Sequence, residues 1–321
     1  MLRQQFTSGS MRHAYLFSGP NSVGRRTLAL RFAQAVNCPE PREPGVPCGT
    51  CRTCGQIERM QQADLSVVQS QAEGDSLKVD QVRELQHMLA LAPYESAYRV
   101  ALLLRFEEAT AGAQNALLKT LEEPNERVLL LVTADDPDNL LPTISSRCEL
   151  LRLRPMPLDA LSAVLREEKD VPKEKAELIA HAAGGRPGYA LRMAKDDSLL
   201  TQRTTWLDDQ LRLLASNRRE RLAYSEGKTR RKKRDEAKSG LRDGLAHWLS
   251  LWRDVMLIAS GSGAPLTNID YTEQITKLAD EVGEAQAARL VSRLEHIFAR
   301  LSTANLQLML DNLLLEWPLK E

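Results

Sequence analysis

The nine residues Gly-Pro-Asn-Ser-Val-Gly-Arg-Arg-Thr, numbers 19–27, decide how the rest of this chain is interpreted. They follow a short apolar run, residues 14–17, and precede an apolar stretch with helical spacing, residues 28–32. A strand, a glycine-rich turn and a helix in this order bind phosphate, because the turn directs backbone N–H groups toward a polyphosphate at the start of the helix. Gly19 and Gly24 stand at the spacing that such a loop requires. The stretch therefore predicts the backbone of a phosphate-binding loop.

The side chains that would act on a nucleotide are missing from this loop. Arg25 stands where a Lys would reach the phosphates, and Arg26 stands where Ser or Thr would hold Mg²⁺. Thr27 comes one residue late, and one residue rotates a helix by about 100°, so its hydroxyl should not face the metal. The buried-type strand 100–104 ends in Arg105, where phosphate-loop enzymes place an Asp that holds the Mg²⁺ shell. The sequence thus predicts a degenerate loop that neither binds ATP tightly nor hydrolyses it.

Three arginines are expected to crowd the region where Mg-nucleotide would lie. Arg25, Arg26 and Arg105 converge there, and we expect some of them to pair with Glu107 or Glu108. Arginine cannot lose its proton to relieve repulsion toward Mg²⁺, so these substitutions both remove ligands and add opposing charge.

Four of the five cysteines lie within one short insertion, at the spacing C-x9-C-x2-C-x2-C. Cys38, Cys48, Cys51 and Cys54 can supply a complete tetrahedron of thiolates for Zn²⁺. A redox pair drawn from the C-x-x-C units and free buried thiols are the alternatives. Since no secretory signal accompanies the cluster, zinc is favoured, and a site filled by four protein ligands is structural.

Composition describes an ordinary globular protein of 321 residues, with 43% hydrophobic and 27% charged residues. The formal net charge is zero, so no global attraction to nucleic acid or membrane is expected. The first residues show no apolar signal segment, and no run is long and apolar enough to span a bilayer. We therefore expect a cytoplasmic protein without membrane contact.

Periodicity divides the chain into three parts. Apolar strands alternate with helices as far as residue 155, which predicts a doubly wound α/β domain. Residues 156–197 are helical and predict a small helical domain. Residues 198–321 carry several long apolar stripes at helical spacing and predict an all-helical C-terminal domain.

Four segments together resemble one family. They are residues 13–20 (His-Ala-Tyr-Leu-Phe-Ser-Gly-Pro), the four-cysteine insertion, residues 115–124 (Asn-Ala-Leu-Leu-Lys-Thr-Leu-Glu-Glu-Pro) and residues 141–148 (Leu-Pro-Thr-Ile-Ser-Ser-Arg-Cys). In this order and spacing they look like the AAA+ subunits of bacterial DNA polymerase III clamp loaders. The motif matches cover about residues 13–150, and the remainder is compatible by length and helicity.

The resemblance implies an AAA+ domain, a helical lid over 156–197 and a helical collar over 198–321 that assembles with sister subunits into a hetero-pentameric ring. It also implies a subunit that helps to load the sliding clamp on primed DNA without hydrolysing ATP, since the active subunits keep Lys, Thr and Asp where this chain has arginines. Two other interpretations remain: a weakly active, gamma/tau-like ATPase subunit of the same loader, and a free-standing zinc-bearing DNA-binding protein. Zero net charge weakens the last.

Three basic features have competing interpretations. The resemblance implies that Arg147 acts as an arginine finger, reaching into a neighbour's ATP site in trans, whereas the alternative is a surface pair with Glu149 or another acid. Arg186 lies near the position of a phosphate-sensing arginine, but Pro187 and Gly188 disturb the register and favour a surface role. The basic run 228–234 either contacts DNA phosphates or the clamp, or is a solvated interhelical segment, which we favour.

Overall fold

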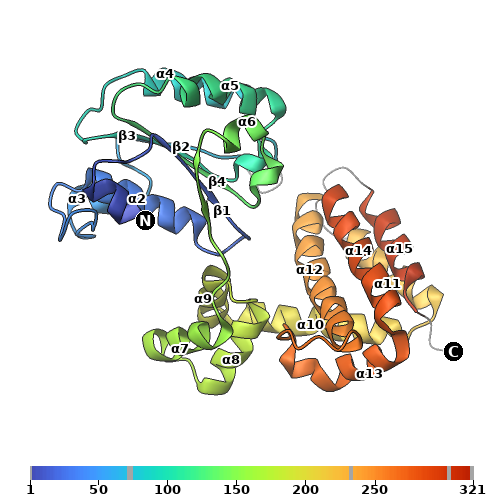
Figure 1. Ribbon diagram of the computed structural model, residues 1–321. Helices are drawn as coiled ribbons and strands as arrows, with labels where there is room; N and C mark the ends of the chain where they lie inside the picture. The colour runs from blue at the N-terminus through green and yellow to red at the C-terminus, as the bar shows by residue number, and fades with distance from the viewer. Residues whose placement is uncertain (1, 71–74, 231–233, 302–304, 319–321) are drawn as a thin grey trace. The chain divides into compact units, whose positions relative to one another are not determined.

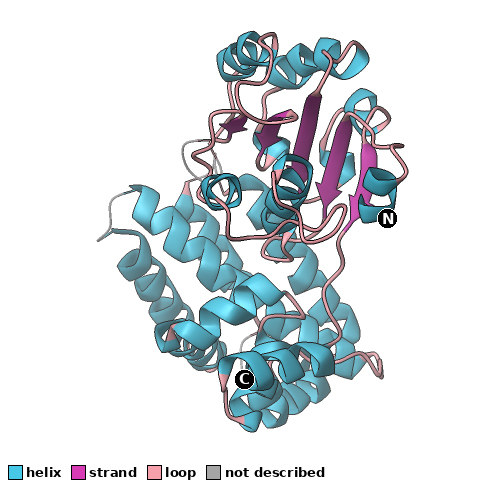
Figure 2. Cartoon of the chain, turned by 90° about the vertical axis from the view of Figure 1, so that its left-hand side faces the viewer, coloured by secondary structure: helices cyan, strands magenta, loops and turns pink. Residues whose placement is uncertain are grey.

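The computed structural model describes residues 2–70, 75–230, 234–301 and 305–318, and these form two units, Met1–Pro155 and Met156–Glu321. The first unit holds a five-stranded sheet in the order β2-β3-β4-β1-β5, in which every neighbouring pair is parallel (Figure 2). The strands are β1 (Ala14–Ser18), β2 (Leu65–Val68), β3 (Arg99–Leu103), β4 (Val128–Ala134) and β5 (Glu149–Arg152). The parallel α/β sheet predicted from the sequence is confirmed.

Helices cover both faces of this sheet (Figure 1). Alternate residues of the strands enter two separate cores: Tyr15 and Phe17 of β1 pack toward α2 and α3, whereas Ala14 and Leu16 pack toward α4 and α5. The continuous apolar strands follow from this, because a parallel sheet covered on both faces exposes neither side to water. The helices and short 3-10 turns are α1 (Leu2–Thr7), α2 (Arg25–Asn37), α3 (Arg52–Glu58), α4 (Val79–Leu89), η1 (Phe106–Glu108), α5 (Ala111–Glu122), η2 (Pro137–Asn139) and α6 (Pro142–Ser145).

The second unit is helical throughout its described residues. Its elements are α7 (Leu158–Lys169), α8 (Lys173–Ala182), α9 (Pro187–Lys195), α10 (Asp197–Leu214), α11 (Arg218–Arg230), α12 (Arg234–Ala259), η3 (Ile269–Tyr271), α13 (Thr272–Val282), α14 (Glu284–Arg300) and α15 (Leu306–Glu316). Helices α7–α9 share a small core of their own, and the later helices share a larger one. The predicted division of these residues at 197 stays a prediction. No helix among the described residues is long and apolar enough to cross a membrane.

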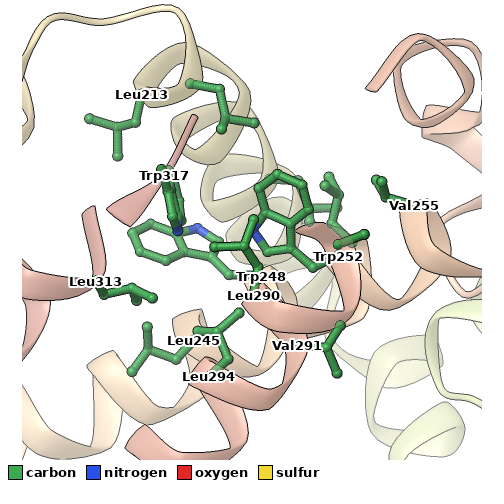
Figure 3. Packing of buried hydrophobic residues seen from close by; sticks show 14 of the residues in the cluster. Leu213, Leu245, Trp248, Trp252, Val255, Leu290, Val291, Leu294, Leu313 and Trp317 are labelled. Atoms are coloured by element: carbon green, nitrogen blue, oxygen red, sulfur yellow. The ribbon is translucent and has the colours of Figure 1, made fainter. Parts of the chain in front are cut away.

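Tryptophans organise the larger core (Figure 3). The Trp248 ring meets Trp206 and Trp317 edge-to-face, with ring centroids 5.6 and 4.8 Å apart, and its indole N–H donates to the Trp206 carbonyl at 2.8 Å. Gly244 of α12 lies directly against the Trp206 ring, where an added Cβ would come within 2.3 Å of a ring carbon. A glycine inside this long helix therefore lets α10 approach α12 closely.

Arg221 of α11 joins the ends of two other helices. Its side chain is fully buried, and its guanidinium donates to carbonyl oxygens at the end of α10 and at the C-terminal end of α15. Those acceptors are the carbonyls of Leu213, Leu214, Leu314, Trp317 and Pro318, at 2.7–3.1 Å. The last carbonyls of a helix have no partner within the helix and carry its negative dipole end, so a cation satisfies both needs. Among the described residues no carboxylate pairs with Arg221.

Replacing Arg221 should destabilise the second unit strongly. In Arg221→Leu, five carbonyl oxygens lose their donor, four of them in buried contacts, and each unsatisfied buried polar group costs about 1–3 kcal/mol. We expect the free energy of unfolding to fall by about 3 kcal/mol or more in chemical denaturation. Arg219→Leu, at an exposed position of the same helix, should change it by less than about 0.5 kcal/mol. Equal stability of the two variants would contradict this role.

Candidate functional site

The four cysteines of the insertion converge on one point. The Sγ of Cys38 lies 3.6 Å from that of Cys48 and 4.0 Å from that of Cys51, and the Sγ atoms of Cys48 and Cys54 are 3.9 Å apart. All four sulfurs lie within 4.8 Å of one another. A tetrahedron with Zn–S bonds of about 2.3 Å has S···S edges of about 3.8 Å. The spacing of the thiols therefore fits tetrahedral Zn²⁺.

Local structure directs each thiol inward. Cys38 ends α2, Cys51 caps the start of α3, and Cys54 is buried in the first turn of α3. Backbone N–H groups of Cys48, Cys51 and Cys54 donate to the preceding sulfurs at 3.3–3.4 Å. Gly49 adopts a φ of +76°, a left-handed turn that favours glycine, between the second and third ligands. The turns and helix ends of the insertion itself thus bring the four thiols together.

The thiols differ in how readily they lose their protons. Hydrogen bonds from the backbone of Cys51 and Thr50 lower the pKa of Cys48 to about 6, whereas burial raises the pKa values of Cys51 and Cys54. A bound cation deprotonates coordinating thiols outright, so the raised values are not a barrier. The side chain of Gln34 in α2 donates to the Cys54 carbonyl at 2.8 Å and ties the cluster to the domain core. Because four protein ligands fill the tetrahedron, such a site can hold structure but cannot activate water.

The glycine loop keeps its shape through contacts within the domain. Gly19 has a φ of +143°, and an added Cβ would lie 2.3 Å from the Leu153 carbonyl oxygen. Its N–H donates to the Ala134 and Asp135 carbonyls at the end of β4. Gly24 has a φ of +109° and precedes the first residue of α2. The fold therefore requires a glycine at position 19 with or without a ligand.

Arg25 is turned into the domain and pairs with Glu107. Only 8% of Arg25 is exposed, and its Nη1 lies 3.7 Å from Oε1 of Glu107. Burial is the main cause that raises the pKa of Glu107, and the negative charges of Asp135 and Glu108 add to it, while Arg25 opposes them. This ion pair occupies the start of α2, where a Lys would otherwise extend toward phosphates.

Arg105 forms the second pair at the same edge of the sheet. Its Nε donates to Oε2 of Glu108 at 3.0 Å, and its Nη2 donates to Oγ of Ser70 at 2.9 Å. Ser70 in turn donates to Glu108, which closes a three-residue network. The Arg105 backbone has a φ of +50°, and its N–H donates to the Thr133 hydroxyl of β4 at 2.9 Å. Spacing within the chain did not reveal Ser70 or Thr133, because both reach the network only when β2, β3 and β4 pair.

The expected pairing of Arg25 and Arg105 with Glu107 and Glu108 is thus present, but Arg26 does not join it. Arg26 and Thr27 are both exposed, on the outward side of the first turn of α2. Arg25 is buried and Arg26 exposed because adjacent residues of a helix point about 100° apart, and the expected place of Arg26 near a nucleotide stays a prediction.

Arg147 lies at the opposite edge of the sheet. It precedes β5, which runs parallel to β1, and Glu149 is in register with Tyr15 near the start of β1. The glycine loop follows the end of β1, so the two lie at opposite ends of the parallel strands. Its Nη2 lies 2.6 Å from Oε1 of Glu122, rather than pairing with Glu149. Its Nη1 donates to the Thr143 carbonyl at 3.0 Å.

Arg186 and Lys228, the other basic residues considered in the sequence, contact groups within the second unit. The Arg186 guanidinium donates to the Ala183 carbonyl at 2.7 Å and lies over the Tyr189 ring. The Lys228 ammonium lies 4.1 Å from the centre of the Trp206 ring and 3.3 Å from Oδ2 of Asp209. Residues 231–233 of the basic run lie outside the described residues, and contact between the run and DNA stays a prediction.

Comparison with known proteins gives two family matches. A model described as DNA polymerase III, delta subunit, matches residues 1–157, and a model of the C-terminal part of that subunit matches residues 235–318. The chain belongs to the DNA polymerase III delta subunit family.

Several curated relatives in this group are similar to the chain. DNA polymerase III subunit delta′ of Pseudomonas aeruginosa is 36% identical over 183 residues, which are 56% of this chain and 55% of the relative. The delta′ subunit of Bacillus subtilis is 32% identical over 203 residues, 63% of this chain and 60% of the relative. Subunit tau of Escherichia coli is 35% identical over 55% of this chain and 28% of its own length. The match therefore spans a little over half of the delta′ relatives.

A solved structure from Thermotoga maritima, titled a DNA polymerase III gamma subunit-related protein, is 16% identical and aligns over 98% of this chain and 97% of its own, with a TM-score of 0.49.

We expect this member of the delta family to contain one equivalent of zinc. Protein purified without added metal should show about one Zn²⁺ per chain by elemental analysis, because four thiolates bind it with folding-scale free energy. Cys54→Ser should lose most of the metal, while Cys148→Ser, outside the cluster, should retain it. Full zinc in the Cys54 variant would exclude the assigned ligand set.

We also expect the isolated chain to show no tight, Mg²⁺-dependent ATP binding. The Arg25–Glu107 and Arg105–Glu108 pairs occupy the places of the phosphate-binding Lys and the metal-holding Asp, and permanently charged guanidinium groups repel Mg²⁺. Titration calorimetry with and without Mg²⁺ measures this directly. Micromolar Mg²⁺-dependent binding would show that the pairs open readily.

Proposed function

We propose that this chain is a ring subunit of the DNA polymerase III clamp loader that helps to open and load the sliding clamp on primed DNA without hydrolysing ATP. One observation carries the proposal: the glycine loop keeps its backbone while two internal arginine–glutamate pairs occupy the places of its working side chains. Membership in the delta family and the delta′ names of two of its relatives support it.

The proposed partners are the other clamp-loader subunits, arranged in a hetero-pentameric ring, and through them the clamp and primed DNA. In this scheme residues 1–155 form the AAA+ domain, residues 156–197 the lid and residues 198–321 the collar that assembles with sister subunits. The cysteine cluster holds structural Zn²⁺ and stiffens the loop that follows α2. The protein acts in the cytoplasm, and no membrane takes part.

We further propose that Arg147 acts on a neighbour's nucleotide. A guanidinium is permanently charged and presents forked N–H donors, so it stabilises the charge that builds on a γ-phosphate during transfer. Arg147 lies at the edge of the sheet opposite the filled glycine loop, and it is partly exposed. A subunit with a disabled pocket therefore still contributes to hydrolysis, in trans.

A second candidate is a weakly active ATPase subunit of the same loader. Gamma/tau relatives match this chain at 34–35% identity, close to the delta′ relatives. The buried Arg25–Glu107 pair opposes this candidate, because nucleotide binding would have to separate it. Mg²⁺-dependent ATP binding by the isolated chain decides between the two.

Arg147→Ala should lower ATP turnover and clamp loading by the assembled complex. A trans-acting arginine raises the rate of hydrolysis at its own site on the order of 10³-fold. Because the complex has several ATP sites, loss of one should lower its total turnover by less. Turnover is measured in a complex reconstituted with the partner subunits, clamp and primed DNA, after gel filtration shows normal assembly. Zinc content and thermal stability should not change.

Arg152→Ala is the matched control, because Arg152 is an exposed arginine at the other end of β5. It should leave turnover unaltered. Unchanged turnover in a fully assembled Arg147 variant would contradict the trans role, and failure of the unaltered chain to join the complex would contradict the proposed function itself.

A further inference from the structure

Two contacts from different helices fix the Arg147 guanidinium. Oε1 of Glu122, the last residue of α5, lies 2.6 Å from Nη2 in an ion pair, and the Thr143 carbonyl in α6 accepts from Nη1 at 3.0 Å. Both terminal nitrogens of the planar group are therefore held, which sets the direction of the whole fork. A single exposed contact would leave the long side chain free to rotate.

The two anchors leave most of the donors available. A guanidinium has five N–H groups, and the hydrogen bond to the Thr143 carbonyl uses one of them. The side chain keeps 36% of its surface exposed, so solvent, or a ligand in its place, reaches the rest. Ordering such a side chain before binding lowers the entropy cost of the later contact. The arrangement is that of a preorganised donor.

The Glu122–Arg147 pair is poorly explained as a stabilising contact. The Glu122 side chain is 49% exposed, and ion pairs this open to water add little stability. A carboxylate in the last turn of a helix also faces the negative end of the helix dipole, which disfavours it. The stability of α5 thus does not explain why position 122 carries a glutamate, whereas the orientation of Arg147 explains it.

We propose that Glu122 is a positioning residue that orients Arg147 for a neighbouring subunit's γ-phosphate. This inference rests on the trans role proposed for Arg147. The charge of the carboxylate holds the Nη2 end of the guanidinium, and the N–H groups that the Thr143 carbonyl does not bind are available to the phosphoryl oxygens. Glu122 itself does not touch nucleotide; it acts through the geometry of Arg147.

The test uses the full chain in the assembled complex, with clamp and primed DNA, and compares kcat and KM for ATP. Glu122→Ala should lower kcat by roughly tenfold with KM unchanged, because misplacement of a transition-state donor affects the chemical step more than ground-state binding. Glu122→Asp should retain more of the turnover than Glu122→Ala, since it keeps a carboxylate for the ion pair with Arg147. Glu123→Ala is the matched control, an exposed acid next in the chain, and should behave like the unaltered protein.

A double-mutant cycle separates positioning from an independent effect. If Glu122 acts only through Arg147, the Glu122→Ala, Arg147→Ala double variant should have the kcat of Arg147→Ala alone. Additive losses would overturn the inference, as would a kcat in Glu122→Ala that is unchanged or raised while Arg147→Ala lowers it. A raised kcat would mean that Glu122 restrains the arginine. If Arg147→Ala itself has no effect, the proposed trans role fails and the inference about Glu122 fails with it. If Arg147→Ala lowers kcat but Glu122→Ala does not, only the inference about Glu122 fails.

Discussion

The close approach of Gly19 to the Leu153 carbonyl is the constraint from which the geometry of the first unit follows. Any side chain at position 19 would collide with the backbone that leaves β5, and the φ of +143° disfavours other residues independently. The Leu153 N–H donates to the Ser18 carbonyl at 2.7 Å, so β1 and the exit of β5 are joined at this point. A glycine loop that supports the sheet in this way is required whether or not a nucleotide binds. The shape of the loop is thus weak evidence for ATP binding, and the side chains that follow it are the stronger evidence.

Much of the first unit could be predicted from the sequence because its signals are local. Continuous apolar runs identified β3 and β4, and cysteine spacing identified a cluster whose geometry its own turns create. The pairing of Arg105 with Glu108 could be anticipated, since the two residues are three positions apart after a strand that ends at the sheet edge. Each of these inferences needed only a few consecutive residues and one rule of backbone geometry.

The features that escaped prediction depend on contacts between distant segments. The strand β5 has only two apolar residues, Leu150 and Leu151, and forms because β1 supplies its register. Helix α11 is strongly polar, and it is joined to the core by Tyr224, which stacks on Trp248, and by Arg221, which is buried against carbonyls almost a hundred residues away. Glu122 reaches Arg147 across 25 positions with no periodicity to suggest it. Tertiary structure, not propensity, decides all three.

The two edges of the parallel sheet hold arginines in opposite states. At the carboxyl edge, Arg25 is buried beside Glu107; burial raises the pKa of that carboxyl, and the charge of Arg25 opposes the rise. At the amino edge, Arg147 is anchored by Glu122 yet keeps a third of its surface in water. Burial makes the first pair costly to open, because separating it strands a charge in a poorly solvated site, whereas the exposed pair exchanges partners at little cost. The same residue type is therefore buried in an ion pair at one edge of the sheet and partly exposed at the other.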